Sequence, residues 1–265
     1  MTDWLELCRA AVADVDEVLA RLPTRAEREP VVGQGLGGDE TTAIDQAAED
    51  AIVARVREAA GAVVSEEMGR LGGSATPLVV VDPIDGSLNA KRGIPFFSIS
   101  IAVAEGETMD DVVFGFVHDF GSREEWTARR GEGAWLDGEP LGAVRPKDEV
   151  EILSFEATRT SLVAEEAPKV ADLAYRLRIM GSLALSLCHL AAGRVDAVCS
   201  LKPARSVDIA AAQLLCVELG LAIDLFDVEE PFGAAPLDLE QRSRVVAAGS
   251  TAVCGRIAAA LGGDA

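Results

Sequence analysis

Basic residues are scarce in this chain. It carries 24 lysines and arginines against 44 aspartates and glutamates, so its 265 residues have a formal net charge of −20 at pH 7. A surface of this charge repels polyanions, which excludes nucleic acid as a partner, whereas divalent cations are attracted to it. We expect most of the acids to form a solvated surface, of the kind that suits a salty cytoplasm, and only a few to be functional.

The chain also lacks segments typical of membrane or exported proteins. No hydrophobic run is long enough to span a bilayer, and residues 1–25 mix acids with apolar positions instead of forming the apolar segment of a signal peptide. We therefore expect a cytoplasmic protein without membrane contacts.

Aromatic residues, histidines and cysteines are few. Aromatic residues make up 5% of an otherwise ordinary globular composition. The only histidines, His118 and His189, lie in apolar strings, and we interpret them as packing residues. The cysteines are far apart and lack the paired spacing of a metal site, so we expect them to be reduced core residues. They are Cys8, Cys188, Cys199, Cys216 and Cys254.

The spacing of apolar residues predicts helices and strands along the whole chain. The first half is predicted to contain helices over 5–22 and 44–56, two buried strands at 62–65 and 78–82, and a meander of strands at 95–105, 111–119 and 124–129. The second half alternates strands near 151–157, 175–180, 195–201 and from 244 with helices near 161–173, 182–193 and 206–219. The glycine-rich residues 33–39 predict a mobile loop, and residues 131–138 predict turns.

This pattern predicts one compact α/β body rather than separate domains joined by a linker. No internal repeat or low-complexity segment interrupts it. We expect an N-terminal α+β half over residues 1–150 and a C-terminal α/β half over residues 151–265.

The stretch LVVVDPIDGSLN (78–89) leads a buried strand into two carboxylates. Pro83 and Gly86 force a turn, which brings Asp82 and Asp85 to one rim. Their repulsion has to be relieved by protonation, an arginine or a metal, and an oxygen-rich cluster suits Mg²⁺ best. Taken alone, DPIDG is better explained as an ordinary turn, so the interpretation depends on its context.

Two other apolar elements carry acids at their ends. In VVSEE a strand is followed by Glu66 and Glu67, and in RSVDIAAAQLL the first turn of an apolar helix contains Asp208. An acid at that position is also explained by the helix dipole. The GSLN stretch after Asp85 adds small residues and backbone N–H groups at a helix start, which is typical of phosphate binding. A metal beside a phosphate cradle indicates phosphoryl chemistry.

In this order and spacing, SEE, DPIDGSLN and SVDIAAAQLL resemble the inositol monophosphatase superfamily of Mg²⁺-dependent, lithium-sensitive sugar phosphatases. The likeness covers nearly the whole chain. DPIDGSLNAKRGIPFFSIS and GGDETTAID look most like the archaeal-type branch, whose members often hydrolyse both fructose 1,6-bisphosphate and inositol monophosphates. The resemblance implies a layered α-β-α-β-α sandwich, a homodimer, and hydrolysis of a sugar or polyol phosphate monoester.

The resemblance also implies two Mg²⁺ ions, with Mn²⁺ as a substitute, and a third, looser ion near the mobile loop. Glu66, Asp82 and the backbone carbonyl of Ile84 would bind one ion, and Asp82, Asp85 and Asp208 the other. Two ions about 4 Å apart can hold the attacking and leaving oxygens of an in-line displacement.

The implied nucleophile is a water that the ions activate and that Asp45 and the Ser87 hydroxyl orient, without a covalent intermediate. Gly86 and Ser87 would also contact the phosphate. The family usually has threonine where Ser87 stands; serine keeps the hydroxyl but loses the methyl group that fixes its rotamer.

Departures from the family pattern bear on the substrate. The family's Trp-Asp pair reads Val207-Asp208, and Leu201 stands where inositol-specific members have an acid that contacts a diol. We therefore expect fructose 1,6-bisphosphate to be the leading substrate and inositol monophosphate the second.

Three basic residues and one turn lie around the expected sugar pocket. Arg178, Lys202 and Arg205 would meet a second phosphate, although each is equally well explained as a surface or acid-pairing base. In MGSLA, Gly181 and Ser182 open a helix and resemble the family's sugar-contact turn.

Other functions fit the motifs less well. A 3′-phosphoadenosine 5′-phosphate phosphatase of the same superfamily is the nearest alternative. Haloacid dehalogenase phosphatases, which would use Asp82 as nucleophile, need their acids two apart and not three. The glycines at 33, 35 and 38 fit a dinucleotide fingerprint, but Asp39 would repel the pyrophosphate. A non-catalytic relative would have a broken set of acids, and here none is missing.

Overall fold

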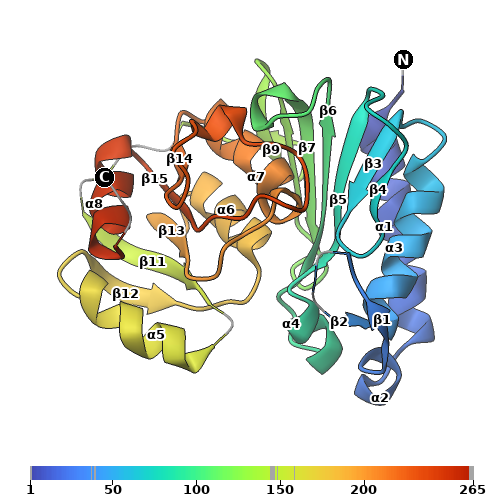
Figure 1. Cartoon of the computed structure of the whole chain (residues 1–265), viewed down its shortest axis with the longest axis horizontal. Helices are drawn as coiled ribbons and strands as arrows, with labels where there is room; N and C mark the ends of the chain where they lie inside the picture. The colour runs from blue at the N-terminus through green and yellow to red at the C-terminus, as the bar shows by residue number, and fades with distance from the viewer. Residues whose placement is uncertain are drawn as a thin grey trace.

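Two β-sheets alternate with three layers of helices in the computed structural model of the chain (Figure 1). The structure describes residues 2–36, 38, 40–143, 147, 149–157 and 159–262. Asp39, on which part of the dinucleotide interpretation depends, and part of the glycine-rich loop lie outside the described residues. The layers run α-β-α-β-α, so the predicted sandwich is confirmed.

The first sheet has eight strands in the order β10-β9-β8-β7-β6-β5-β3-β4. All neighbours pair antiparallel except β3 and β5, which are parallel. The strands are β3 (Ala62–Ser65), β4 (Gly69–Leu71), β5 (Leu78–Asp85), β6 (Ser98–Ala104), β7 (Val112–Asp119), β8 (Glu125–Arg129), β9 (Gly133–Leu136) and β10 (Glu139–Pro140).

Helices α1 (Trp4–Arg21) and α3 (Ala43–Val56) cover the outer face of this sheet (Figure 1). The apolar stripe of α1 that includes Cys8, Val12 and Val15 packs in the same core as Ile52 of α3 and Val79 of β5. In the sequence, α1 is followed by α2 (Arg25–Arg28) and by the hairpin of β1 (Val31–Gln34) and β2 (Glu40–Thr42), which leads into α3.

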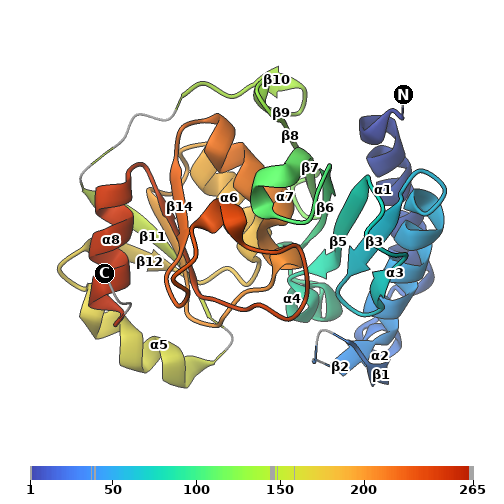
Figure 2. The same ribbon diagram turned by 45° about the horizontal axis from the view of Figure 1, so that its top comes forward.

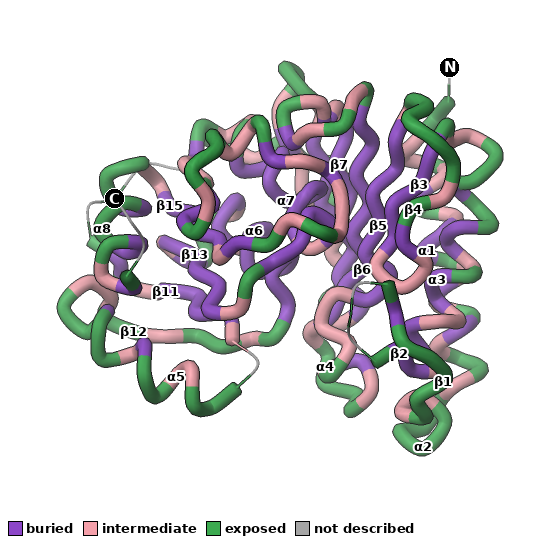
Figure 3. The backbone as a smooth tube through the Cα atoms, viewed as in Figure 1, coloured by how far each residue is buried: buried purple, intermediate pink, exposed green. Residues whose placement is uncertain are grey.

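Helices α6 (Leu183–Ala191) and α7 (Ser206–Glu218) form the middle layer, between the two sheets (Figure 2). Both are apolar on nearly every side, as expected for helices that are covered on two faces. Figure 3 shows them as buried tubes next to the buried strands of both sheets. Their first turns point toward the end of β5, where α4 (Ser87–Arg92) begins.

The second sheet has five strands in the order β12-β11-β13-β15-β14. β11 pairs in parallel with β12 and β13, and β15 pairs antiparallel with β13 and β14. The strands are β11 (Val150–Glu156), β12 (Ala174–Arg178), β13 (Ala197–Ser200), β14 (Ala222–Leu225) and β15 (Val245–Ala248). Its outer face is covered by α5 (Thr160–Glu166) and α8 (Thr251–Ala260) (Figure 1). Three 3₁₀ turns lie at Met109–Asp111, Ala167–Val170 and Phe232–Ala234.

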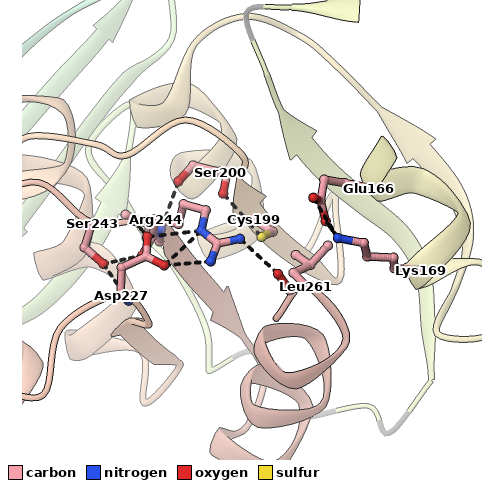
Figure 4. A network of polar contacts seen from close by, with 9 residues as sticks. Glu166, Lys169, Cys199, Ser200, Asp227, Ser243, Arg244 and Leu261 are labelled. Carbon is pink, nitrogen blue, oxygen red and sulfur yellow. Dashed lines mark hydrogen bonds and ion pairs between the residues drawn. The ribbon is translucent and has the colours of Figure 1, made fainter. Parts of the chain in front are cut away.

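A polar network holds the C-terminal segment on this sheet (Figure 4). The Arg244 guanidinium forms an ion pair with Asp227, with Nη2 2.6 Å from Oδ1, and donates to the carbonyl of Leu261 at 3.1 Å. Beside it, the Val245 N–H donates to the Ser200 hydroxyl at 2.8 Å. Because Ser200 ends β13 and lines the cavity described below, this network fixes one wall of the cavity.

Several predictions of elements were wrong in detail. β9 and β14 were not predicted, Gly33 and Gln34 belong to β1 and not to the predicted loop, and β6 begins three residues later than predicted. The cysteines are all buried and unpaired, which confirms their interpretation. None of the helices in the described part of the chain is both long and apolar enough to cross a membrane.

Candidate active site

A cavity of about 280 Å³ lies where the end of β5 meets the first turns of α6 and α7. Acidic side chains dominate its lining, and three basic side chains accompany them. The acids are Glu40, Asp45, Glu66, Glu67, Asp82, Asp85, Glu156 and Asp208, and the bases are Lys91, Lys202 and Arg205. Four of the five predicted metal ligands are thus acids of one cavity, and the fifth, Ile84, lines it as well.

The two acids of the β5 motif are held by different partners. Asp82 is only 2% exposed, and its Oδ1 accepts the backbone N–H of Ile84 at 3.1 Å. Asp85 Oδ2 accepts the Ser182 hydroxyl at 2.6 Å and the Ala184 N–H at 2.7 Å, so this carboxylate caps the N-terminus of α6. Because β5 lies in the first half and α6 in the second, the Asp85 contacts join the halves across the cavity.

Gly86 is a position where only glycine fits. Its φ is +91°, and a Cβ would stand 3.1 Å from the backbone oxygens of both Gly181 and Phe96. The turn at Gly86 leads into α4, whose first residue, Ser87, donates its hydroxyl to the carbonyl of Ile84 at 2.8 Å. The β5 turn is therefore packed against the loop that precedes α6.

Arg205 forms ion pairs with two of the acids. It is the N-cap residue of α7, and its Nη2 donates to Glu66 Oε1 and, at 3.1 Å, to Asp208 Oδ1. Its backbone N–H donates to Asp208 Oδ2 at 2.7 Å. The guanidinium thus connects the end of β3 with the first turn of α7.

Burial opposes the ionisation of Glu66, Asp82 and Asp85. Burial raises the pKa of Glu66 to about 8 despite the nearby guanidinium, and burial raises the pKa of Asp85 to about 7. Burial, followed by the carboxylates of Glu66, Asp85 and Asp208, raises the pKa of Asp82 well above its ordinary value. Eight acids face three basic side chains in the cavity lining, so additional cations would be stabilised here.

The donor set suits a hard divalent cation, because it consists of carboxylates and one backbone carbonyl. As the side chains stand, however, no three Asp, Glu, His or Cys residues in the described part of the chain form a group that could already hold a metal ion. The sequence motifs predicted that these acids would lie within coordinating reach of shared metal ions. The difference has a visible cause, since Arg205 occupies Glu66 and Asp208 while Asp85 binds Ser182 and Ala184.

Asp45 lines the cavity and has one carboxylate oxygen without a hydrogen-bond partner among the described residues. It lies in the first turn of α3, where its Oδ2 accepts the N–H of Thr42 at 3.2 Å and also the Thr42 hydroxyl. Its Oδ1 is buried and has no hydrogen-bond partner among the described residues. An unpaired carboxylate oxygen at the wall of a cavity can accept a proton or orient a water.

The predicted substrate contacts are distributed unevenly. Gly86, Ser87, Gly181 and Lys202 line the cavity, as does Arg205. Arg178 is exposed on the edge strand β12 and is not among the residues that line the cavity. Ser182 is not among them either, because its hydroxyl is directed to Asp85. The ion pairs of Arg205 match the alternative that it is an acid-pairing base.

Glu156 and Asn89 are among the residues in or beside the site that were not predicted from the sequence. Glu156 lines the cavity at the end of β11, and its carboxylate accepts the Gly181 N–H at 2.8 Å and the Ser186 hydroxyl at 2.7 Å. Asn89 donates through Nδ2 to the carbonyls of Phe96 and Met180, both at 2.8 Å. Glu156 could have been predicted, because it ends an apolar strand in the same way as Asp82 follows the apolar residues of β5.

Glu49 is a third residue that the sequence analysis missed. It lies one helical turn after Asp45, is fully buried, and accepts the backbone N–H groups of Glu67 and Met68 at 3.0 Å each through Oε1. These two bonds hold the turn that follows β3 and carries Glu66. Glu49 thereby positions an acid of the cavity without lining it.

Substituting Glu49 by alanine should destabilise the protein by about 2–3 kcal/mol, because the part-buried N–H groups of Glu67 and Met68 lose their acceptor. The same change should lower the phosphate-monoester hydrolysis that the sequence resemblance implies, because the turn that carries Glu66 loses its support. Urea unfolding and steady-state kinetics measure the two effects. Glu49→Gln keeps an acceptor oxygen and serves as the matched control, with a smaller loss of stability. Equal stability of Glu49→Ala and the wild type would rule out the positioning role.

The comparisons with known proteins point to one family. The model of the inositol monophosphatase family matches residues 3–262. A fructose-1,6-bisphosphatase/inositol-1-monophosphatase of Archaeoglobus fulgidus is 30% identical over 249 residues, with 93% of each chain covered. An enzyme described in the same words from Thermococcus kodakarensis is 32% identical over 219 residues, with 82% of each chain covered. The crystal structure of an inositol monophosphatase–fructose 1,6-bisphosphatase superposes with a TM-score of 0.86 at 28% identity, covering 98% of this chain and 100% of the other.

Proposed function

The chain belongs to the inositol monophosphatase family and is a phosphoric monoester hydrolase, and from this premise we propose that it cleaves a sugar or polyol phosphate in a Mg²⁺-dependent reaction. The observation that carries the proposal is the placement of Asp82, a buried carboxylate with a strongly raised pKa, in one cavity with Glu66, Asp85 and Asp208. Such a cluster is costly to ionise unless cations share it.

The residues proposed to hold the ions are Glu66, Asp82, Asp85, Asp208 and the carbonyl of Ile84. When bound, divalent cations would neutralise the charge on the phosphate and lower the pKa of a nucleophilic water. After burial, the carboxylates of Glu66, Asp85 and Asp208 all contribute to the raised pKa of Asp82. It is the proposed shared ligand.

Asp45 and Ser87 are the proposed groups that orient the attacking water. Asp45 Oδ1 is buried at the cavity wall without a partner among the described residues and accepts a hydrogen bond from the water. Ser87 donates its hydroxyl to Ile84 and thereby leaves its own oxygen as an acceptor at the cavity wall. The backbone at Gly86 and Ser87 is the proposed contact for a phosphate oxygen.

The proposed substrate order is fructose 1,6-bisphosphate first and inositol monophosphate second. Lys202 and Lys91 line the cavity and would meet a distal phosphate, whereas Arg178 no longer belongs to this set. Leu201, which stands where inositol-specific relatives would have an acid, is 5% exposed and is not among the lining residues. The boundary near residue 150 between two halves and a homodimeric assembly remain parts of the proposal.

Phosphate release from a panel of substrates tests the proposed function. The panel consists of fructose 1,6-bisphosphate, inositol 1-phosphate and 3′-phosphoadenosine 5′-phosphate, each with Mg²⁺, without Mg²⁺, and with Mg²⁺ plus lithium. We expect release from the first substrate to exceed that from the other two, to require Mg²⁺, and to fall with lithium. Release from the adenosine compound alone would instead support the nearest alternative, and release without any divalent cation would contradict the mechanism.

A further inference from the structure

Arg205 occupies two of the carboxylates that the proposed function assigns to a metal ion. Both oxygens of Asp208 are engaged by this residue, Oδ1 by the guanidinium and Oδ2 by the backbone N–H. Glu66 Oε1 accepts from the same guanidinium nitrogen. The three side chains are poorly exposed, at 7% for Arg205, 13% for Glu66 and 16% for Asp208. The contact is therefore part of the cavity wall rather than a surface ion pair.

A guanidinium in this position is a permanent positive charge. It has only donors and does not lose its proton in a protein, so it neutralises Glu66 and Asp208 when no other cation is present. A divalent cation bound by the same carboxylates would stand close to the guanidinium and would be repelled by it. Its binding must also weaken at least one of the arginine's hydrogen bonds. The absence of a ready-made coordinating group among the described residues is the expected consequence of this pairing.

We propose that Arg205 is a built-in competitor of the metal, whose guanidinium lowers the affinity of the cavity for divalent cations by holding Glu66 and Asp208. The inference rests on the proposed Mg²⁺-dependent function. Arg205 stabilises the metal-free protein and must yield its hydrogen bonds as the cation enters. It is a positioning residue that sets cation affinity, in place of the distal-phosphate contact expected from the sequence.

An opposite role makes the opposite prediction. If Arg205 only holds the two carboxylates in the orientation that the ion needs, its removal will weaken cation binding. The sign of the change in affinity therefore decides between competition and support, whichever way the catalytic rate responds.

The test is direct Mn²⁺ binding by the purified full chain, measured by the electron paramagnetic resonance signal of free Mn²⁺, together with thermal unfolding in EDTA. Arg205→Met removes the charge at similar length. We expect its Mn²⁺ dissociation constant to fall at least about 10-fold, because Glu66 and Asp208 then face the ion without the competing guanidinium. We also expect it to unfold at a lower temperature than the wild type in EDTA and to regain more stability on addition of Mn²⁺.

Two further variants keep the result interpretable. Arg205→Lys retains the positive charge but carries it on a shorter side chain that holds the two acids less closely, so its dissociation constant should fall less, by roughly 3-fold. This variant gives the same sign if Arg205→Met does not fold. Arg194→Met is the matched control, because it breaks the ion pair with Glu124, neither residue lines the cavity, and the change should cost stability without altering Mn²⁺ affinity.

Unchanged or weaker Mn²⁺ binding by Arg205→Met and Arg205→Lys would overturn the competitor role. A lack of Mn²⁺ binding by the wild type and by all variants would refute the proposed function itself, and the inference with it. The two failures are thereby distinguishable.

Discussion

The Asp82→Asn variant should lose phosphate-monoester turnover by at least about 10³-fold while its fold remains intact. Asp82 is the proposed ligand shared by two ions. An amide in its place takes a negatively charged ligand away from both of them. The loss should appear in kcat with each substrate that the wild type cleaves. Steady-state phosphate release measures it.

Asparagine should be tolerated at this position because it has the same shape and keeps the oxygen that accepts the Ile84 N–H. Burial and three neighbouring carboxylates oppose the charged form of Asp82, so a neutral side chain relieves repulsion in the metal-free protein. Thermal unfolding of Asp82→Asn in EDTA should therefore occur at or above the wild-type temperature.

Asp119→Asn is the matched control for Asp82→Asn. Asp119 is also buried, but its carboxylate accepts the Gly121 N–H and the Ser122 hydroxyl at 2.7 Å each and does not line the cavity. We expect this variant to lose stability and to keep turnover. Activity of Asp82→Asn within about 10-fold of the wild type would contradict the role of Asp82 as a shared ligand.

Removal of divalent cations should have the second large effect. In EDTA, turnover should fall by at least about 10³-fold, because the phosphate charge is no longer neutralised. A cation present at about 100 times its dissociation constant adds about 2.7 kcal/mol to the free energy of unfolding. For a chain of this size, its removal should therefore lower the unfolding temperature by roughly 5 °C.

The reversal of the EDTA effect provides the control. Excess Mg²⁺ should restore both turnover and unfolding temperature, whereas K⁺ at the same ionic strength should restore neither, because a monovalent ion does not replace the lost charge. Full turnover in the presence of EDTA would show that the acids of the cavity serve another purpose.

Local patterns predicted most of the fold because apolar periodicity is a local property. The helix predicted over 44–56 is α3 (Ala43–Val56), and the strand at 62–65 is β3. β9 and β14 were missed because neither is a fully buried apolar run of the kind that β3 is; each pairs with a neighbour, β8 or β15. β6 begins late because the backbone of Phe96 is held by the Asn89 side chain.

The site was predictable only in part, for a related physical reason. Motif chemistry singled out Asp82, Asp85, Glu66 and Asp208, and the structure brings all four to one cavity. Their hydrogen-bond partners come from distant parts of the chain, so neither the Arg205 ion pair with Glu66, across 139 residues, nor the Asp85 contact with Ser182, across 97, could be derived from spacing.

These long-range contacts connect the two halves at the cavity itself. Asp85 binds the start of α6, Asn89 binds the carbonyl of Met180, and Arg205 reaches from α7 to Glu66. A cavity built from such distant segments depends on these contacts, so substitutions at them should affect binding and stability together.

Anomalous diffraction from crystals soaked in Mn²⁺ and phosphate tests the central claim most directly, because it locates the ions without reference to activity. We predict anomalous peaks in the cavity within coordinating distance of Asp82, with Glu66, Asp85 and Asp208 around them and phosphate alongside. A cavity without anomalous density, or Mn²⁺ bound only elsewhere on the acidic surface, would contradict the proposed metal site and the phosphatase mechanism built on it.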